Sequence, residues 1–165
     1  MPTVTRYFED FKVGTEAESP RRTITDADIT LFAGLSGDHN PHHTDDIFAA
    51  TLPFKKRIAH GALTFSISTG LSVRMAPPNP AVIAFYGVDT LRFVRPVFIG
   101  DTIQVRKRVE EKEAKDEKRG IVKFESSVVN QDNQVVLRYY DVVLLQRKPV
   151  KTRKKRTKKK ASRAK

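Results

Sequence analysis

The sequence contains no cysteine, and this absence excludes a disulfide framework, a thiolate metal site and cysteine catalysis. It also lacks a glycine-rich phosphate-binding loop and any alternating strand–helix–strand pattern, so a doubly wound nucleotide-binding fold is not expected. No apolar run approaches the ~20 residues that a membrane-spanning helix needs. The N-terminal segment has no apolar stretch of the kind found in a secretory signal. We therefore expect a soluble, cytoplasmic protein.

Positive charge is distributed unevenly along the 165 residues. The formal net charge is +12, with 31 Lys and Arg residues against 19 Asp and Glu residues. Residues 147–165 hold 12 of the basic residues and no acidic one, which leaves residues 1–146 with 19 of each sign. Because no large apolar side chain follows Val150, this segment cannot build a core. We expect one folded domain over residues 1–146 and a disordered basic tail over residues 147–165.

The basic tail has two interpretations, and the sequence does not separate them. It increases solubility, or it tethers the protein nonspecifically to a polyanion such as nucleic acid, an anionic membrane or the surface of a storage granule. Sequence-specific reading of nucleic acid is not expected, because the tail has no aromatic side chain on which bases could stack.

Hydrophobic periodicity changes along the domain from helical to alternating. A capping pattern at residues 25–28 begins a helix over residues 26–35, which Gly37 ends. Residues 61–75 form the most apolar helical segment, with small Ser, Thr and Gly side chains that allow close approach to a sheet. Strands in meander order follow over residues 81–95, 102–109, 121–129 and 135–145, with a charged turn at 110–119. This order predicts an α+β fold, in which one long helix packs against a face of an antiparallel sheet.

Three of the four histidines lie within residues 36–45, in the sequence SGDHNPHHTD. Asp38 and His43 stand on either side of Asn40 and Pro41, and a turn at the proline allows the carboxylate and the imidazole to converge. Such a pair can share a water molecule, because one group can take its proton while the other directs the water or returns a proton. The simpler interpretation is that Asp38 caps the following turn and that His43 is a hydrogen-bonded core residue.

Gly61 begins the apolar helix and follows the fourth histidine, His60. Backbone N–H groups in the first turn of a helix have no intrahelical partner and carry partial positive charge. A glycine at this place lets a ligand oxygen come close, which an oxyanion hole for the enolate of a thioester requires. The simpler interpretation is that Gly61 allows the helix to start in a tight space.

These segments resemble a known signature. The string GDHNPHHTD at residues 37–45, followed by IAHGAL at residues 58–63, resembles the motif of the MaoC-like dehydratases, which include the (R)-specific enoyl-CoA hydratases. Residues 8–14 and 91–102 are similar to the opening and to a strand–turn segment of the same family, so the resemblance covers roughly residues 7–146. It implies a hot-dog fold, in which a curved antiparallel sheet wraps the helix at residues 61–75.

The resemblance also implies a function: the reversible addition of water to trans-2-enoyl-CoA, giving (R)-3-hydroxyacyl-CoA. No cofactor is implied beyond the coenzyme A that the substrate carries, and a homodimer is implied with the acyl-CoA pocket at or near its interface. Asp38 and His43 would activate the water, and the Gly61 amide would hold the thioester oxygen. Asn40 would orient the loop, and Thr69 would be a hydrogen-bond partner of Asp38.

One position departs from the family pattern. The residue before the catalytic histidine is usually aliphatic, and here it is His42. This leaves the catalytic pair intact and puts the substrate preference in question. His39 occupies a variable position of the motif, so no role is assigned to it.

A metal site is the first alternative. Asp38, the three histidines beside it and His60 are ligand types that suit zinc or iron. However, donors crowded around a proline turn rarely all point inward, and the resemblance accounts for Asp38, His43 and Gly61 without a metal. We therefore expect no metal.

Two further alternatives share the expected fold. A thioesterase would send the water to the thioester carbonyl instead of the β-carbon, and fold alone does not separate the two activities. A module that binds acyl thioesters without catalysis fits less well, because both Asp38 and His43 are present.

Overall fold

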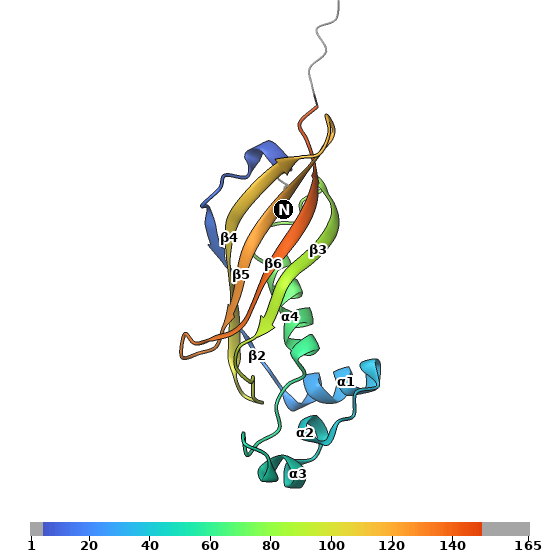
Figure 1. Ribbon diagram of the computed structural model, residues 1–165, viewed down its shortest axis with the longest axis vertical. Helices are drawn as coiled ribbons and strands as arrows, with labels where there is room; N and C mark the ends of the chain where they lie inside the picture. The colour runs from blue at the N-terminus through green and yellow to red at the C-terminus, as the bar shows by residue number, and fades with distance from the viewer. Residues whose placement is uncertain (1–4, 150–165) are drawn as a thin grey trace, which may run out of the picture.

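A six-stranded antiparallel sheet curves around one long helix, α4 (Gly61–Val73), in the computed structural model, which describes residues 5–149 (Figure 1). The order across the sheet is β1-β4-β5-β6-β3, and the short β2 also pairs with β4. This arrangement is the predicted α+β hot-dog fold. The strands are β1 (Glu16–Glu18), β2 (Arg22–Thr23), β3 (Val82–Phe93), β4 (Thr102–Ala114), β5 (Arg119–Val129) and β6 (Val135–Gln146).

The position of β3 differs from the predicted meander. Strands β4, β5 and β6 are neighbours in sequence order, but β3 pairs with β6 at the far edge and not with β4. The alternation of apolar and polar residues identifies a strand but not the strand it pairs with, because the pairing depends on the path of the chain around α4. Three register shifts interrupt the pairing of β3 with β6, and such irregularities bend a strand. The bent strand closes the curved sheet beside the helix (Figure 1).

The β4–β5 hairpin is longer than predicted. The charged segment at residues 110–119 was expected to be a turn, but β4 continues to Ala114 and β5 begins at Arg119. Within this extension Glu111 pairs with Lys123 and Glu113 with Ile121. An antiparallel strand with one face in water accepts charged side chains on that face, so polarity alone was a poor sign of a turn.

Three helices gather at the end of the molecule where α4 begins (Figure 1). They are α1 (Asp26–Ser36), α2 (Pro41–Thr44) and α3 (Asp46–Thr51), and a 3₁₀ turn, η1 (Phe8–Asp10), lies near the N-terminus. The predicted cap of α1 is confirmed, since the Thr25 side chain accepts from the Asp28 amide and Gly37 follows with φ 77°. The short α2 was not predicted, because a turn was expected at Asn40 and Pro41 and the proline is instead the first residue of a helix. No helix within residues 5–149 is long and apolar enough to cross a membrane.

The main core lies between α4 and the concave face of the sheet. Leu63, Ile67 and Leu71 of α4 are buried against Val105 of β4 and Leu137 of β6. A 13-residue helix is marginal by itself in water, so this packing holds α4 in place. The helix ends two residues earlier than the predicted Met75.

A buried polar cluster lies on the same face of the sheet. The Lys107 ammonium is 2.5 Å from the Asp141 carboxylate, which is 1% exposed and also accepts from the Ser126 hydroxyl at 2.6 Å. The Tyr139 hydroxyl lies 3.0 Å from the Ser68 hydroxyl of α4, and burial raises the pKa of this tyrosine. The cluster therefore satisfies its buried charges internally.

The folded domain continues beyond its predicted end at residue 146. Arg147 forms an ion pair with Glu9 of η1 at 2.9 Å, and the Lys148 ammonium contacts Asp10. The Lys148 amide also donates to Glu9 at 2.9 Å. These two residues were assigned to the tail because of their charge, but their acidic partners come from the distant N-terminal turn. The tail from residue 150 onward lies outside the described residues.

The buried ion pair yields a prediction for stability. Replacing Lys107 by Met leaves the Asp141 carboxylate buried without its counter-charge, and we expect this to lower the free energy of unfolding by about 3–5 kcal/mol. Combining Lys107→Met with Asp141→Leu removes both charges, so the double variant should regain most of the loss. Urea denaturation followed by circular dichroism measures these free energies.

The exposed ion pair of Arg106 with Glu18 is the matched control, because exposed pairs contribute little. Arg106→Ala should leave the unfolding midpoint nearly unchanged. A double variant at Lys107 and Asp141 as unstable as the single one would contradict the prediction.

Candidate active site

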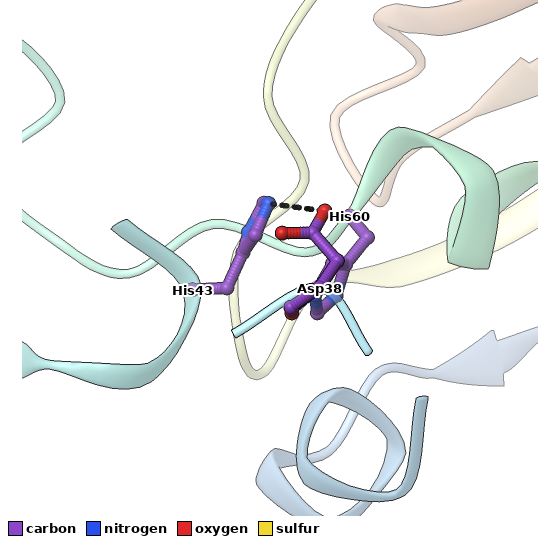
Figure 2. Close-up of side chains that lie close together, drawn as sticks. All are labelled: Asp38, His43 and His60. Atoms are coloured by element: carbon purple, nitrogen blue, oxygen red, sulfur yellow. Dashed lines mark hydrogen bonds and ion pairs between the residues drawn. The ribbon is translucent and has the colours of Figure 1, made fainter. Parts of the chain in front are cut away.

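Asp38, His43 and His60 meet where the loop after α1 passes the first turn of α4 (Figure 2). Asp38 comes from the loop, and half of its side chain (53%) is exposed to solvent. His43 lies in α2 and His60 is the N-cap residue of α4, and both are buried, at 5% and 2% exposure. An exposed carboxylate thus lies beside two buried imidazoles.

Local hydrogen bonds shape the loop that carries Asp38. The Asp38 amide donates to the Ser36 hydroxyl at 3.2 Å, and the Asn40 amide donates to Asp38 Oδ1 at 3.2 Å. The Asn40 side chain caps α2 by accepting from the His42 amide at 3.3 Å. The expected orienting role of Asn40 therefore has a physical basis, since its cap sets the start of the helix that holds His43.

The Asp38–His43 pair has the geometry of two acceptors facing each other. His43 Nδ1 lies 2.7 Å from the Ile58 carbonyl oxygen, and a carbonyl only accepts, so the ring hydrogen is on Nδ1. The Nε2 lone pair then faces Asp38 Oδ2 at 4.0 Å, which is too long for a direct hydrogen bond. The predicted convergence of the two side chains is confirmed.

Burial lowers the pKa of His43 from its ordinary value of 6.5. The neighbouring His60 and His42 lower it further, whereas the Ile58 carbonyl and the Asp38 carboxylate oppose the shift. The net direction favours the neutral ring near neutral pH. His43 therefore presents a lone pair that can accept a proton.

His60 makes contacts that the sequence did not reveal. Its Nε2 lies 2.9 Å from the Asp38 backbone oxygen, and its ring stacks on His43 with centroids 3.7 Å apart and planes at 28°. The one signal in the sequence was its place directly before Gly61. The His42 ring packs edge-on against the His43 ring, with their centroids 3.8 Å apart. His39 is exposed.

Asp38, His43 and His60 form a group of side chains that could offer ligands to a metal ion. Donor atoms of Asp38, His43 and His60 lie within 4.8 Å of one another. Each ring has one nitrogen bonded to a backbone oxygen, which leaves a lone pair on His43 Nε2 and on His60 Nδ1. Donors at about 2.0–2.1 Å from a tetrahedral zinc lie about 3.4 Å apart. His43 Nε2 and Asp38 Oδ2 are 4.0 Å apart, so this pair is wider than such a site requires.

Gly61 and His43 line the same cavity. The cavity measures about 420 Å³, and its lining includes His42, His43, Gly61, Phe93 and Arg95. Gly61 is the first residue of α4, and His60 supplies no side-chain cap to this helix end. A Cβ added at Gly61 would lie 2.8 Å from the Phe93 ring, so a larger residue there would require this ring to shift. Both the oxyanion interpretation and the packing interpretation of Gly61 fit this position.

Thr69 does not have its predicted contact within the chain. Its hydroxyl donates to the Ser66 carbonyl at 2.8 Å, and it lines a separate cavity of about 550 Å³ with Tyr139 and Asp141. Eight residues along a helix correspond to ~12 Å, which places Thr69 two turns beyond the helix start beside Asp38. The prediction of Thr69 as a partner of Asp38 is therefore wrong for a single chain.

Comparisons with known proteins identify the family of this chain. A family model described as "MaoC like domain" matches residues 10–131. The chain is 48% identical over 118 residues to the protein MaoC of Klebsiella aerogenes, a match that covers 68% of this chain and 35% of that protein. It is 46% identical over 101 residues to an (R)-specific enoyl-CoA hydratase of Rhodospirillum rubrum, covering 61% of this chain and 67% of the hydratase.

A solved structure extends the likeness to almost the whole fold. The X-ray structure of a monoamine oxidase regulatory protein from Archaeoglobus fulgidus has a TM-score of 0.83 and 40% identity, covering 88% of this chain and 97% of that one. The chain spans about a third of the length of the Klebsiella protein, so the activity of that whole protein does not carry over directly. The family match includes Asp38, His43 and Gly61. The chain belongs to the MaoC-like domain family.

Proposed function

We propose that this protein is a hydro-lyase that adds water reversibly to trans-2-enoyl-CoA and gives (R)-3-hydroxyacyl-CoA. The observation that carries the proposal is the lone pair of His43 facing the Asp38 carboxylate at 4.0 Å, beside the helix start at Gly61. The similarity to a relative named (R)-specific enoyl-CoA hydratase supports the choice of substrate.

The spacing of the catalytic pair suits one water molecule. Two acceptors 4.0 Å apart repel unless a donor lies between them, and water has two hydrogens to give. A water that donates one hydrogen to His43 Nε2 and one to Asp38 Oδ2 is held with its oxygen lone pairs directed away from both. This oxygen is the nucleophile of the proposed reaction, so the pair both activates and orients it.

The proposed addition balances without an outside reactant. His43 takes one proton from the water, the water oxygen forms a bond to the β-carbon, and the double-bond electrons move toward the thioester oxygen. A proton returned to the α-carbon completes the product and restores the starting protonation of the pair. The Gly61 amide at the helix N-terminus would stabilise the enolate oxygen while its charge is present.

A thioesterase on the same fold remains the second candidate function. The same water could attack the thioester carbonyl, and the Gly61 amide would serve the resulting oxyanion equally well. The two reactions have different products, because hydrolysis releases a free thiol and hydration removes the conjugated double bond. A catalytically silent acyl-binding protein would do neither.

The proposal includes a homodimer. Strand β3 pairs with β6 along one edge, and no other strand within residues 5–149 pairs with its second edge. Large apolar side chains on and after β3 are exposed, among them Phe85, Tyr86 and Phe93. An open strand edge with apolar side chains suits pairing with a second copy, and such pairing would cover these side chains.

Partners of the tail and the cellular location remain proposals. Residues 150–165 carry ten Lys and Arg residues and no acidic one, which supports nonspecific attraction to nucleic acid, an anionic membrane or a granule surface. A cytoplasmic location stays a prediction from the sequence.

Loss of either member of the pair should abolish efficient hydration. We expect Asp38→Asn and His43→Gln each to lower kcat by about 10²–10⁴-fold, the usual contribution of a positioned acid or base. The loss of absorbance of a conjugated enoyl-CoA measures hydration, and a thiol reagent measures hydrolysis in the same samples. His39→Gln is the matched control on the same loop and should keep wild-type activity.

Full hydration by both pair variants would refute the proposed roles. If the wild-type protein releases a free thiol but does not hydrate the double bond, the result would favour the thioesterase. No turnover of either kind would favour the silent binding protein.

The pH dependence of kcat/KM should report the lowered pKa of His43. The neutral ring accepts the proton, so activity should fall as the pH decreases through the pKa of His43. Because burial lowers this pKa, the acid limb should lie below the ordinary value of 6.5. Initial rates measured from about pH 5 to pH 8 test this expectation. An acid limb above 6.5 in both the wild type and His39→Gln would contradict it.

The tail should be separable from catalysis. Truncation after Pro149 keeps the contacts of Arg147 and Lys148 with η1, so we expect unchanged kcat and KM on soluble enoyl-CoA. Truncation after Gln146 removes these contacts and should lower the thermal unfolding temperature. A large loss of turnover in the longer truncation would show that the tail takes part in catalysis.

A further inference from the structure

His60 touches every other part of the candidate site. It is bonded covalently to Gly61, its Nε2 lies 2.9 Å from the Asp38 backbone oxygen, and its ring stacks on His43 at 3.7 Å. Because the three partners come from a loop, from α2 and from α4, a single side chain joins the three elements that carry the site (Figure 2). We propose that His60 is a positioning residue that sets the distance and orientation between Asp38, His43 and the Gly61 amide.

The hydrogen bond to Asp38 is the first part of this role. A carbonyl oxygen only accepts, so His60 carries its hydrogen on Nε2 and donates it to the backbone of Asp38 itself. The exposed Asp38 side chain has no buried surroundings to hold it, since half of it is in solvent. Anchoring its backbone to the buried N-cap of α4 therefore fixes where the carboxylate can reach.

The stack on His43 is the second part. The planes of His60 and His43 differ by 28°, and the ring of Phe32 lies 5.1 Å from His60. Since His60 is 2% exposed, it has no room to turn, and it limits rotation of the His43 ring. The direction of the His43 Nε2 lone pair is thereby held toward Asp38.

An unpartnered nitrogen separates this role from a purely structural one. His60 Nδ1 is buried and has no hydrogen-bond partner within the described part of the chain. A buried polar atom without a partner costs stability, so an apolar ring of similar size would satisfy packing alone at least as well. The histidine is better explained by the bond from Nε2 than by the core around it.

The experiment uses the full chain and two substitutions that separate the hydrogen bond of His60 to Asp38 from its stacking on His43. His60→Phe keeps a flat ring against His43 and removes the donor, whereas His60→Gln keeps an N–H donor at a similar reach and removes the ring. The proposal rests on the proposed hydratase function, so kcat and KM for a trans-2-enoyl-CoA are measured together with amide hydrogen exchange of residues 36–43. His39→Phe is the matched control.

We expect His60→Phe to lower kcat by about 10- to 100-fold, because small misplacements of reacting groups cost rates of this order. KM and the thermal unfolding temperature should change little, and exchange in residues 36–43 should become faster. His60→Gln should recover most of kcat and the slow exchange, while His39→Phe should match the wild type in all four measurements.

Wild-type kcat and exchange in His60→Phe would overturn the proposal. Equal losses of kcat and of unfolding temperature in both His60 variants would also overturn it, because they would show a structural role alone. An inactive wild-type protein would refute the proposed function instead, and the exchange of residues 36–43 would still decide whether His60 holds the loop.

Discussion

The burial of α4 against the concave face of the sheet is the constraint on which the site depends. Leu63 and Ile67 hold the first half of this helix in the core, so its N-terminal end has one position. His60 and Gly61 stand at that end, and the loop with Asp38 is bonded to it. The hydrophobic packing of α4 therefore fixes the positions of the polar groups at its N-terminal end.

The two catalytic candidates differ chiefly in their surroundings. His43 is buried, which lowers its pKa and keeps a lone pair available, whereas half of the Asp38 side chain is in water. A pair in which one group is neutral and the other charged can divide proton transfer and orientation between them. The fold produces this difference because α2 turns His43 toward the core while the preceding loop remains at the surface.

Local patterns in the sequence predicted those structural features that depend on interactions between neighbouring residues. The cap at Thr25 and the apolar helix from Gly61 each depend on neighbouring residues, and the structure has both. Non-local features were missed or misplaced. The partner of β3, the length of the β4–β5 hairpin and the contacts of Arg147 with Glu9 depend on segments far apart in the chain.

The prediction for Thr69 failed for a different reason. The family resemblance suggested that Thr69 is a partner of Asp38, but it gave no information on the distance between the two residues. Thr69 lies two turns beyond Gly61 and lines a cavity together with the buried pair of Lys107 and Asp141. Both oxygens of the Asp141 carboxylate accept a hydrogen bond, one from Lys107 and one from Ser126, as expected of a buried charge that serves stability. Within the described residues, His60 Nδ1 at the start of α4 and Ser72 Oγ near its end are both buried without a hydrogen-bond partner. Of these two side chains, only His60 contacts Asp38 and His43, so the start of α4 is where an unpartnered polar atom and the candidate pair coincide.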